Sequence, residues 1–462
     1  MHLTPRTPIP QQVSLVGNGE FTLRRAVALC LLLSPALGSS LVRAQGAVHA
    51  GEDLPVQVDV DLPLVEPSLA IHPKDPDNLV AAAMVGHPDG TYGSLLFSSP
   101  DGGRIWRKHD LGIRDGGDVW TAFLADGTAV FATGAEDSSV RVFRSADGGR
   151  TWSQPVVQKE VQDHPMLAVD GGSLYLVSSG TRKGPSGRAR DAVLAARSTD
   201  GGATFAEPGF AVASNLRYEA HASIVSSEGA LLVAFADYGR PGERRRLERQ
   251  RDWLIASEDG GRSFSEPLLI SEGCDARGGW SSLAVNLSDR LAPPDRIFHV
   301  CAAPQFDGIQ LRYSDTFGEI WSAPVRIDRP GNVTPYSRTP AVAVNKDGVV
   351  GVVWYDGRGD GSTIKGSFRC TEIFFAASFD GGATFLPEVR VSSEKSCPAA
   401  PKNVEVALRY PAGGEYMGLA AAPDGTFRLL WSDSRSGIYQ LRTATVSVEV
   451  PAAVSPRSPA SP

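Results

Sequence analysis

The chain has 462 residues, of which 49 are Gly and 33 are Pro, and its hydrophobic fraction of 42% is enough for large buried cores. So high a share of Gly and Pro is typical of a protein with many tight turns. The formal net charge is −7 at pH 7, and an acidic chain of this kind argues against a nucleic-acid partner.

Residues 1–44 are predicted to be a secretory signal peptide. A loose first segment precedes an apolar run over residues 26–42, and small residues beside Arg43 place the cleavage site near Ala44. A membrane anchor is the alternative, but Pro35 interrupts a run that is already short for spanning a bilayer. We therefore expect a secreted or periplasmic protein without stable membrane insertion.

An eight-residue block, Ser-x-Asp-Gly-Gly-x-x-Trp/Phe, recurs along the rest of the chain. Five copies begin at Ser99, Ser145, Ser198, Ser257 and Ser378, and a weaker sixth copy, SDTFGEIW, has Thr in place of Asp. Recurrence at this spacing indicates a repeated supersecondary unit. In each copy the Asp can accept hydrogen bonds from a turn, the Gly pair can adopt positive φ, and the aromatic ring can pack on the sheet.

These blocks resemble the Asp boxes (bacterial neuraminidase repeats) of the sialidase-like β-propellers. The resemblance implies an all-β protein with one propeller domain over residues 45–450, built from four-stranded antiparallel blades. Residues 451–462 would form a disordered Pro/Ser-rich tail. The resemblance also implies that the Asp boxes join third to fourth strands on one face. Ligands would then bind on the opposite face, where the innermost strands begin.

A second repeat predicts the number of blades. Seven segments fit an innermost strand, with small residues suited to the crowded wall of a channel: 66–71, 119–124, 164–169, 220–225, 280–285, 339–344 and 416–421. Several are followed by Asp-Gly and a second apolar strand, as at Asp126-Gly127 and Asp424-Gly425, which is a strong hairpin signal. Seven blades are favoured, and six are the alternative.

Polar and aromatic residues gather at or just before the starts of these strands. They are Glu66, Asp118, Asp163, His164, Glu219, His221, Trp280, Arg338, Glu415 and Tyr416. We expect catalytic roles for Glu66, Glu219, Arg338 and Tyr416. We expect substrate-binding roles for Asp163, His164, His221 and Trp280.

A shorter motif marks the ends of predicted second strands, where an aromatic residue is followed by Asp and then Arg at two-residue intervals. It reads Trp354-Tyr355-Asp356-Gly357-Arg358 and Trp431-Ser432-Asp433-Ser434-Arg435. One interpretation is structural: the motif joins neighbouring blades through an ion pair beside an aromatic ring, and we call this a latch. The other interpretation is functional and adds Arg358 and Arg435 to the substrate-binding residues.

The resemblance to sialidases implies a specific chemistry. Those enzymes hold a substrate carboxylate with three arginines and use a Tyr–Glu pair as nucleophile and an Asp as acid/base. Arg338 could supply one arginine, and Glu66 or Glu219 could be the partner of Tyr416. The position of the first arginine, however, holds Val65. Two functions therefore stay open: a glycoside hydrolase of the exo-sialidase type or a relative, and a non-catalytic propeller that binds glycan or protein on the same face.

Other chemistries have weaker support. His164 and His221, with Asp163 and Glu219, could bind a divalent metal, but no short-spaced ligand motif indicates one, so we expect no metal and no cofactor. A Ser/His/Asp hydrolase is disfavoured because Gly-x-Ser-x-Gly is lacking. The basic segment 240–251 could attract anionic sugars or be a solvated loop. The expected partner is a glycan or glycoconjugate, and the expected state is a monomer.

Of the five cysteines, Cys30 would leave with the signal peptide. The other four are an even number in an oxidising compartment, which favours two disulfides. Their positions in the blades suggest the pairs Cys274–Cys301 and Cys370–Cys397. Free buried thiols are the alternative.

Overall fold

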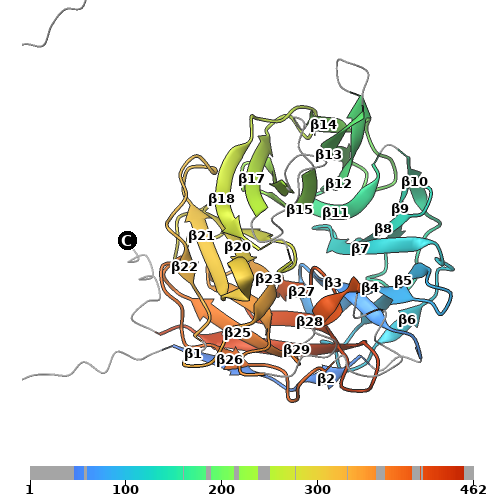
Figure 1. Cartoon of the computed structure of the whole chain (residues 1–462). Helices are drawn as coiled ribbons and strands as arrows, with labels where there is room; N and C mark the ends of the chain where they lie inside the picture. Colours follow the sequence, from blue (N-terminus) through green and yellow to red (C-terminus); the bar gives the residue numbers. More distant parts are fainter. Residues whose placement is uncertain are drawn as a thin grey trace, which may run out of the picture. The chain divides into compact units, whose positions relative to one another are not determined.

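The computed structural model describes residues 46–56, 60–159, 161–183, 189–212, 218–237, 250–275, 277–329, 331–360, 370–397, 406 and 409–451. The expected signal peptide, all but the first residue of the expected tail and nearly all of the basic segment 240–251 lie outside these residues. Seven antiparallel sheets stand around a ring (Figure 1). The prediction of a seven-bladed, all-β propeller is confirmed, and the six-bladed alternative is excluded.

Each of the first six blades runs from an innermost strand to an outer one in chain order, and the first three strands of the seventh do the same. The innermost strands are β3 (Leu64–His72), β7 (Gly116–Phe123), β11 (Asp163–Asp170), β15 (Tyr218–Val225), β19 (Ser282–Val285), β23 (Ser337–Val344) and β27 (Gly418–Ala421). The second strands are β4 (Asp75–Gly86), β8 (Ala129–Ala135), β12 (Ser173–Lys183), β16 (Leu231–Asp237), β20 (Ile297–Ala302), β24 (Val350–Asp356) and β28 (Phe427–Asp433). All seven predicted segments overlap an innermost strand, although β19 and β27 begin two residues later than expected.

The third strands are β5 (Tyr92–Ser99), β9 (Val140–Ser145), β13 (Ala189–Ser198), β17 (Gln250–Ser257), β21 (Ile309–Ser314), β25 (Glu372–Ser378) and β29 (Gln440–Glu449). The outer strands of the first six blades are β6 (Arg107–His109), β10 (Val156–Gln158), β14 (Gly209–Val212), β18 (Leu268–Cys274), β22 (Val325–Arg326) and β26 (Val389–Arg390). The outer strand of the seventh blade comes from the start of the propeller sequence. It is β1 (Ala47–Ala50), which pairs with β29, and the short β2 (Leu54–Pro55) pairs with β29 as well.

The hydrophobic core lies between neighbouring blades. Phe375 of the sixth blade packs against Phe427 of the seventh at 5.3 Å between ring centroids, and both side chains are fully buried. Similar clusters of buried aliphatic and aromatic side chains join the other blades. Each blade therefore buries both of its faces against its neighbours, which leaves only the two ends of the ring for function.

The Asp boxes form the turns after the third strands, as expected. In the first box, the Asp101 carboxylate accepts hydrogen bonds from the backbone N–H groups of Arg104 (3.1 Å) and Ile105 (2.9 Å). Gly103 has a φ of 94°. The indole N–H of Trp106 donates to the Gly103 carbonyl at 3.0 Å. In the weaker copy, the Thr316 hydroxyl takes over part of the Asp's role by accepting from the N–H of Ile320 at 2.8 Å.

Two disulfides join the four cysteines of the propeller. Cys274 at the end of β18 is bonded to Cys301 in β20, which links the fourth blade to the fifth. Cys370 is bonded to Cys397, and these two residues flank β25 and β26 of the sixth blade. These are the two pairs suggested by the positions of the cysteines in the blades.

Candidate functional site

Four innermost strands share a backbone irregularity near the end where the candidate residues lie. Glu66, Asp118, His164 and Thr339 all have positive φ, between 42° and 54°, and the pairing with the second strand shifts register beside each of them. A non-Gly residue in this conformation costs about 1–3 kcal/mol and persists where the surrounding structure enforces it, commonly at functional sites. Its repetition in four blades makes this end of the ring the candidate functional face.

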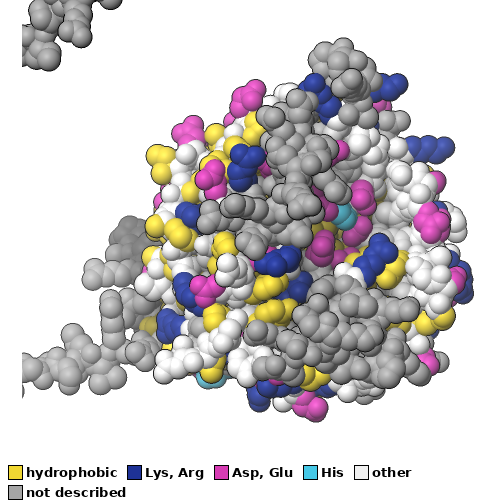
Figure 2. Space-filling model, in the orientation of Figure 1, with side chains coloured by type: hydrophobic (Ala, Val, Ile, Leu, Met, Phe, Trp, Pro, Cys, Tyr) yellow, Lys and Arg dark blue, Asp and Glu magenta, His cyan; other side chains and the backbone are white. Residues whose placement is uncertain are grey.

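The side chains at this end converge on His164. Its Nε2 lies 3.5 Å from Oδ2 of Asp118, and its Nδ1 lies 3.1 Å from Oε1 of Glu219. Asp163 and Glu415 also lie close enough to interact electrostatically with the imidazole. Figure 2 shows acidic side chains gathered around a histidine near the centre of the ring. We call Glu66, Asp118, Asp163, His164, Glu219, Trp280, Glu415 and Tyr416 the central cluster.

Glu66 is the most deeply buried carboxyl group of the central cluster, at 2% exposure. Its Oε1 accepts a hydrogen bond from the Glu415 backbone N–H at 3.1 Å, and its carboxyl group is hydrogen-bonded to that of Asp118. Two carboxyl groups can form such a bond only if one of them carries a proton. Glu66 and Asp118 therefore form a pair that shares a proton.

Burial, together with the neighbouring carboxylates of Asp118 and Glu415, raises the pKa of Glu66 well above its usual range. Burial also raises the pKa of Asp118, although His164 and the hydrogen bond with Glu66 oppose the shift. Both effects favour the neutral acid, because low polarity and nearby like charge each penalise a carboxylate. Both pKa shifts therefore favour retention of the shared proton.

His164 is held in its charged form. Burial alone would lower the pKa of His164, but the carboxylates of Asp118 and Glu219 outweigh it and raise this pKa well above the usual value. Asp118, Asp163 and His164 bring possible metal-ligand atoms within 4.8 Å of one another. A protonated imidazole has no lone pair for a metal, so His164 would have to lose its proton before a cation could bind there.

Aromatic rings form one wall of the central cluster. The Trp280 ring lies 4.5 Å from the His164 ring and is stacked on the Tyr416 and His221 rings at 5.1 and 5.5 Å. Trp280 is 5% exposed, and its indole N–H has no acceptor among the described residues. His221 accepts a hydrogen bond at Nδ1 from the Ser281 backbone N–H at 3.3 Å, and burial lowers its pKa. His221 therefore supports the Trp280 ring from behind.

The Tyr416 hydroxyl is bound to backbone. It accepts a hydrogen bond from the N–H of Val119 at 2.9 Å and donates to the carbonyl of the same residue at 3.4 Å. Burial raises the pKa of Tyr416 well above its ordinary value, and the carboxylates of Glu66 and Asp118 add to the shift. A tyrosine nucleophile needs the opposite environment, one that helps it to lose its proton.

The arginines expected at the site have other contacts. Arg338 is 4% exposed, lies near Glu415 and points its guanidinium toward the ring of Phe306. Arg358 binds Asp356 and Glu388 at 2.5 and 2.7 Å, and both acids belong to its own blade, the sixth.

Arg435 makes a comparable set of contacts. It binds Asp433 at 2.7 Å and Asp53 at 3.0 Å, and its guanidinium also donates to the Ser393 hydroxyl at 2.8 Å. Val65, at the position of the first sialidase arginine, is fully buried.

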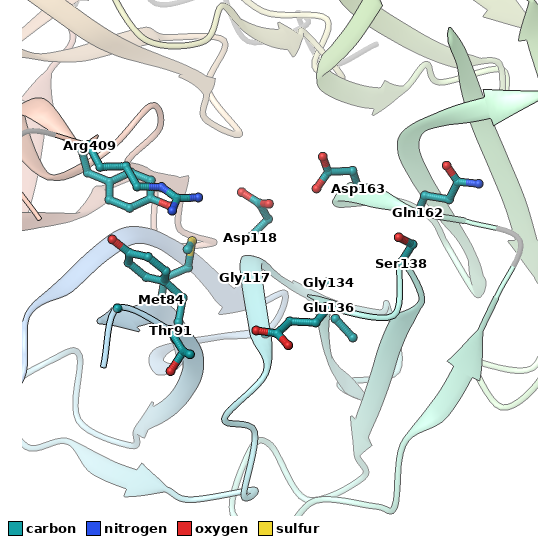
Figure 3. Close-up of a pocket in the computed structure, with 15 residues that line it drawn as sticks. Met84, Thr91, Gly117, Asp118, Gly134, Glu136, Ser138, Gln162, Asp163 and Arg409 are labelled. Atoms are coloured by element: carbon teal, nitrogen blue, oxygen red, sulfur yellow. The ribbon is translucent and has the colours of Figure 1, made fainter. Parts of the chain in front are cut away.

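A cavity of about 550 Å³ opens beside the central cluster (Figure 3). Asp118 and Asp163 belong to both. On one side stand Tyr92, Tyr410 and Arg409, and the Arg409 guanidinium lies over the two rings at 4.8 and 5.3 Å. No sequence motif marks these three residues, since Tyr92 opens a third strand and Arg409 and Tyr410 lie outside every repeat.

The fold defines the class as a seven-bladed Asp-box β-propeller. No protein-family model and no curated protein sequence matches the chain. Similar solved structures include a Hadza microbial sialidase, Hz136, with 14% identity over 79% of this chain and 73% of that one, at a TM-score of 0.46. YCF48 from Cyanidioschyzon merolae has 14% identity over 86% of this chain and 98% of its own, at a TM-score of 0.46.

A Trypanosoma rangeli sialidase is similar over 82% of this chain but only 57% of its own, with 12% identity and a TM-score of 0.43. Likeness at this level concerns the fold alone. Among the described residues, no helix is long and apolar enough to cross a membrane.

Proposed function

We propose that this protein is a glycoside hydrolase that cleaves neutral glycans with carboxyl groups of the central cluster. One observation carries the proposal: Asp118 shares a proton with Glu66, while Glu219 is paired with the charged imidazole of His164. Glycosidases need such a division, with one carboxyl group protonated and the other ionised. Asp118 and Glu219 are also accessible, with side chains 19% and 25% exposed.

Each residue then has a defined role. Asp118, ion-paired with His164 in the resting site, delivers to the glycosidic oxygen the proton that it shares with Glu66. Glu219, as a carboxylate, either attacks the anomeric carbon or deprotonates the water that does so.

The charge of the central cluster favours a neutral substrate over a sialic acid. Five carboxyl groups surround one imidazolium, and Arg338 is almost fully buried. A substrate carboxylate would meet like charge there instead of the forked guanidinium donors that bind it best. The proposal therefore departs from sialidase chemistry, while the binding face is the one expected from the sequence.

A non-catalytic glycan-binding propeller is the second candidate. The backbone-bound hydroxyl of Tyr416 favours it, because a propeller that once used this tyrosine as a nucleophile would have lost its activity. The same face and the same Trp280 would then bind a sugar without cleaving it.

We propose in addition that the protein is secreted. The disulfides Cys274–Cys301 and Cys370–Cys397 support this, because disulfides persist in oxidising compartments. They agree with a signal peptide that ends near Ala44.

A panel of 4-nitrophenyl glycosides (β-glucoside, β-galactoside and N-acetyl-β-glucosaminide) and an aryl α-sialoside tests the proposed function. We expect release from at least one neutral substrate and none from the sialoside. Asp118→Asn and Glu219→Gln should each lower kcat/KM by about 10²- to 10⁴-fold. Glu207→Gln, an exposed residue of the Asp-box face, is the matched control and should match the wild type.

Two results would contradict the hydrolase. One is a wild-type protein that cleaves nothing in the panel, and the other is full activity in Asp118→Asn or Glu219→Gln. Tyr416→Phe separates the two chemistries: it should reduce turnover far less than Glu219→Gln does, whereas a tyrosine nucleophile would make it inactive.

A further inference from the structure

The cavity of Figure 3 differs in character from the central cluster. It is lined by Tyr92, Tyr410 and Arg409 on one side and by Gln162, Asp163 and Ser138 on the other, with Asp118 between them. At about 550 Å³, it lies within the range of roughly 300–1,000 Å³ that is usual for ligand sites.

Four glycines form part of the cavity wall: Gly90, Gly116, Gly117 and Gly134. A β-carbon on Gly117 would meet only the Met84 methyl group, at 3.5 Å, so the space above this residue is open. Because these residues have no side chains, a ligand can approach the backbone of this wall closely.

Arg409 and the tyrosines form a firm platform on the other side. The Tyr92 and Tyr410 rings meet edge to face at 5.3 Å, and the Arg409 guanidinium covers both. Such cation–π contacts fix a side chain that would otherwise be free in solvent. Arg409 is exposed and keeps donor groups for a ligand, while no other described residue brings a positive charge to the cavity lining.

We propose that this cavity is the subsite for the leaving-group sugar of a neutral oligosaccharide, an inference that rests on the proposed hydrolase function. The general acid must lie beside the glycosidic oxygen, and Asp118 stands where the central cluster meets the cavity. Glu219 lies on the other side of His164, away from the cavity lining. The sugar that departs with the oxygen is therefore held between Arg409 and Asp163, and the preferred substrate is an oligosaccharide rather than a monosaccharide with a small leaving group.

Paired substrates test the subsite. For wild type and variants, kcat/KM is measured with cellotriose, maltotriose, β-1,4-galactotriose and chitotriose, and with the 4-nitrophenyl glycoside of the same sugar. Gly117→Leu fills the cavity and Arg409→Ala removes the platform. Each should lower the ratio of trisaccharide to aryl-glycoside kcat/KM by about tenfold or more, which corresponds to about 1.4 kcal/mol of lost binding to the transition state. Arg107→Ala, exposed on β6, should leave the ratio unchanged.

The outcomes separate the two proposals. If the wild type cleaves its substrates and both variants, still folded by their melting temperatures, keep the wild-type ratio, the subsite is overturned and the hydrolase stands. If the wild type cleaves nothing, the hydrolase is overturned. Calorimetric titration of chitotriose and cellotriose then decides the cavity, since weaker binding by Gly117→Leu supports it as a sugar site and equal binding refutes it.

Discussion

At the scale of single residues, the proposed acid catalysis depends on the proton shared by Glu66 and Asp118. The sequence placed both residues near the start of an innermost strand, and it assigned a catalytic role to Glu66 but none to Asp118. It could not show that the two carboxyl groups touch, because they belong to different blades. Nor could it show that the Tyr416 hydroxyl faces the backbone of Val119, since this contact joins residues 297 positions apart.

The shared proton predicts a pH dependence. Activity requires the proton shared by Glu66 and Asp118, so kcat/KM should fall as pH rises through the raised pKa of this pair. Glu66→Gln removes the second carboxyl group and leaves an amide that donates a hydrogen bond to Asp118, which lowers the pKa of Asp118. The alkaline limb of the profile should therefore move to lower pH in Glu66→Gln. An alkaline limb that stays in place, or moves to higher pH, would show that Glu66 does not control the protonation of Asp118. Glu207→Gln serves as the control and should leave the profile unchanged.

At the scale of elements, the Asp boxes were predicted well because each is a local device. All of its hydrogen bonds lie within a few residues, so type and spacing in the sequence determine the turn. The innermost strands were found for a similar reason, through the repeat of small apolar residues. Their positive-φ positions were not predicted, because Glu66, His164 and Thr339 are β-region residues by local rules, each standing before a Pro.

The Asp box of the third blade offers a stability test. The Thr204 hydroxyl and backbone N–H donate hydrogen bonds to the Asp200 carboxylate at 2.6 and 2.8 Å. These two hydrogen bonds, the one from the hydroxyl above all, lower the pKa of Asp200 to about 2. Asp200→Ala should therefore lower the free energy of unfolding by about 1 kcal/mol. The difference in unfolding free energy between wild type and Asp200→Ala should be fully present above the unfolded-state pKa of Asp, about 3.9. It should shrink as pH falls toward 2, because protonation of Asp200 then weakens the same hydrogen bonds in the wild type.

Chemical denaturation at several pH values measures this difference. Thr199→Ala, the exposed neighbour in the same turn, is the matched control and should be close to neutral. Equal stabilities of Asp200→Ala and Thr199→Ala near neutral pH would mean that the carboxylate has no structural role in the box.

At the scale of the whole molecule, the number of blades followed from the repeats, but closure of the ring did not. The seventh blade lacks an Asp box, and its outer strand β1 comes from residues 47–50. Nothing local to β29 indicates that partner. Asp53, next to β1, secures the closure through Arg435 and Arg442. The cavity beside Asp118 was missed for the same reason, since the loop that carries Arg409 approaches the first two blades only in the closed ring.

The central claim is that Asp118 and Glu219 flank the scissile bond of a neutral oligosaccharide. A crystal structure of Glu219→Gln with the trisaccharide that the wild type cleaves tests it most directly. We predict a glycosidic oxygen within hydrogen-bond distance, about 2.6–3.2 Å, of the Asp118 carboxyl group, with one sugar ring beside Trp280 and the next between Arg409 and Asp163. A trisaccharide bound on the Asp-box face, or bound without contact to Asp118 and residue 219, would contradict the account.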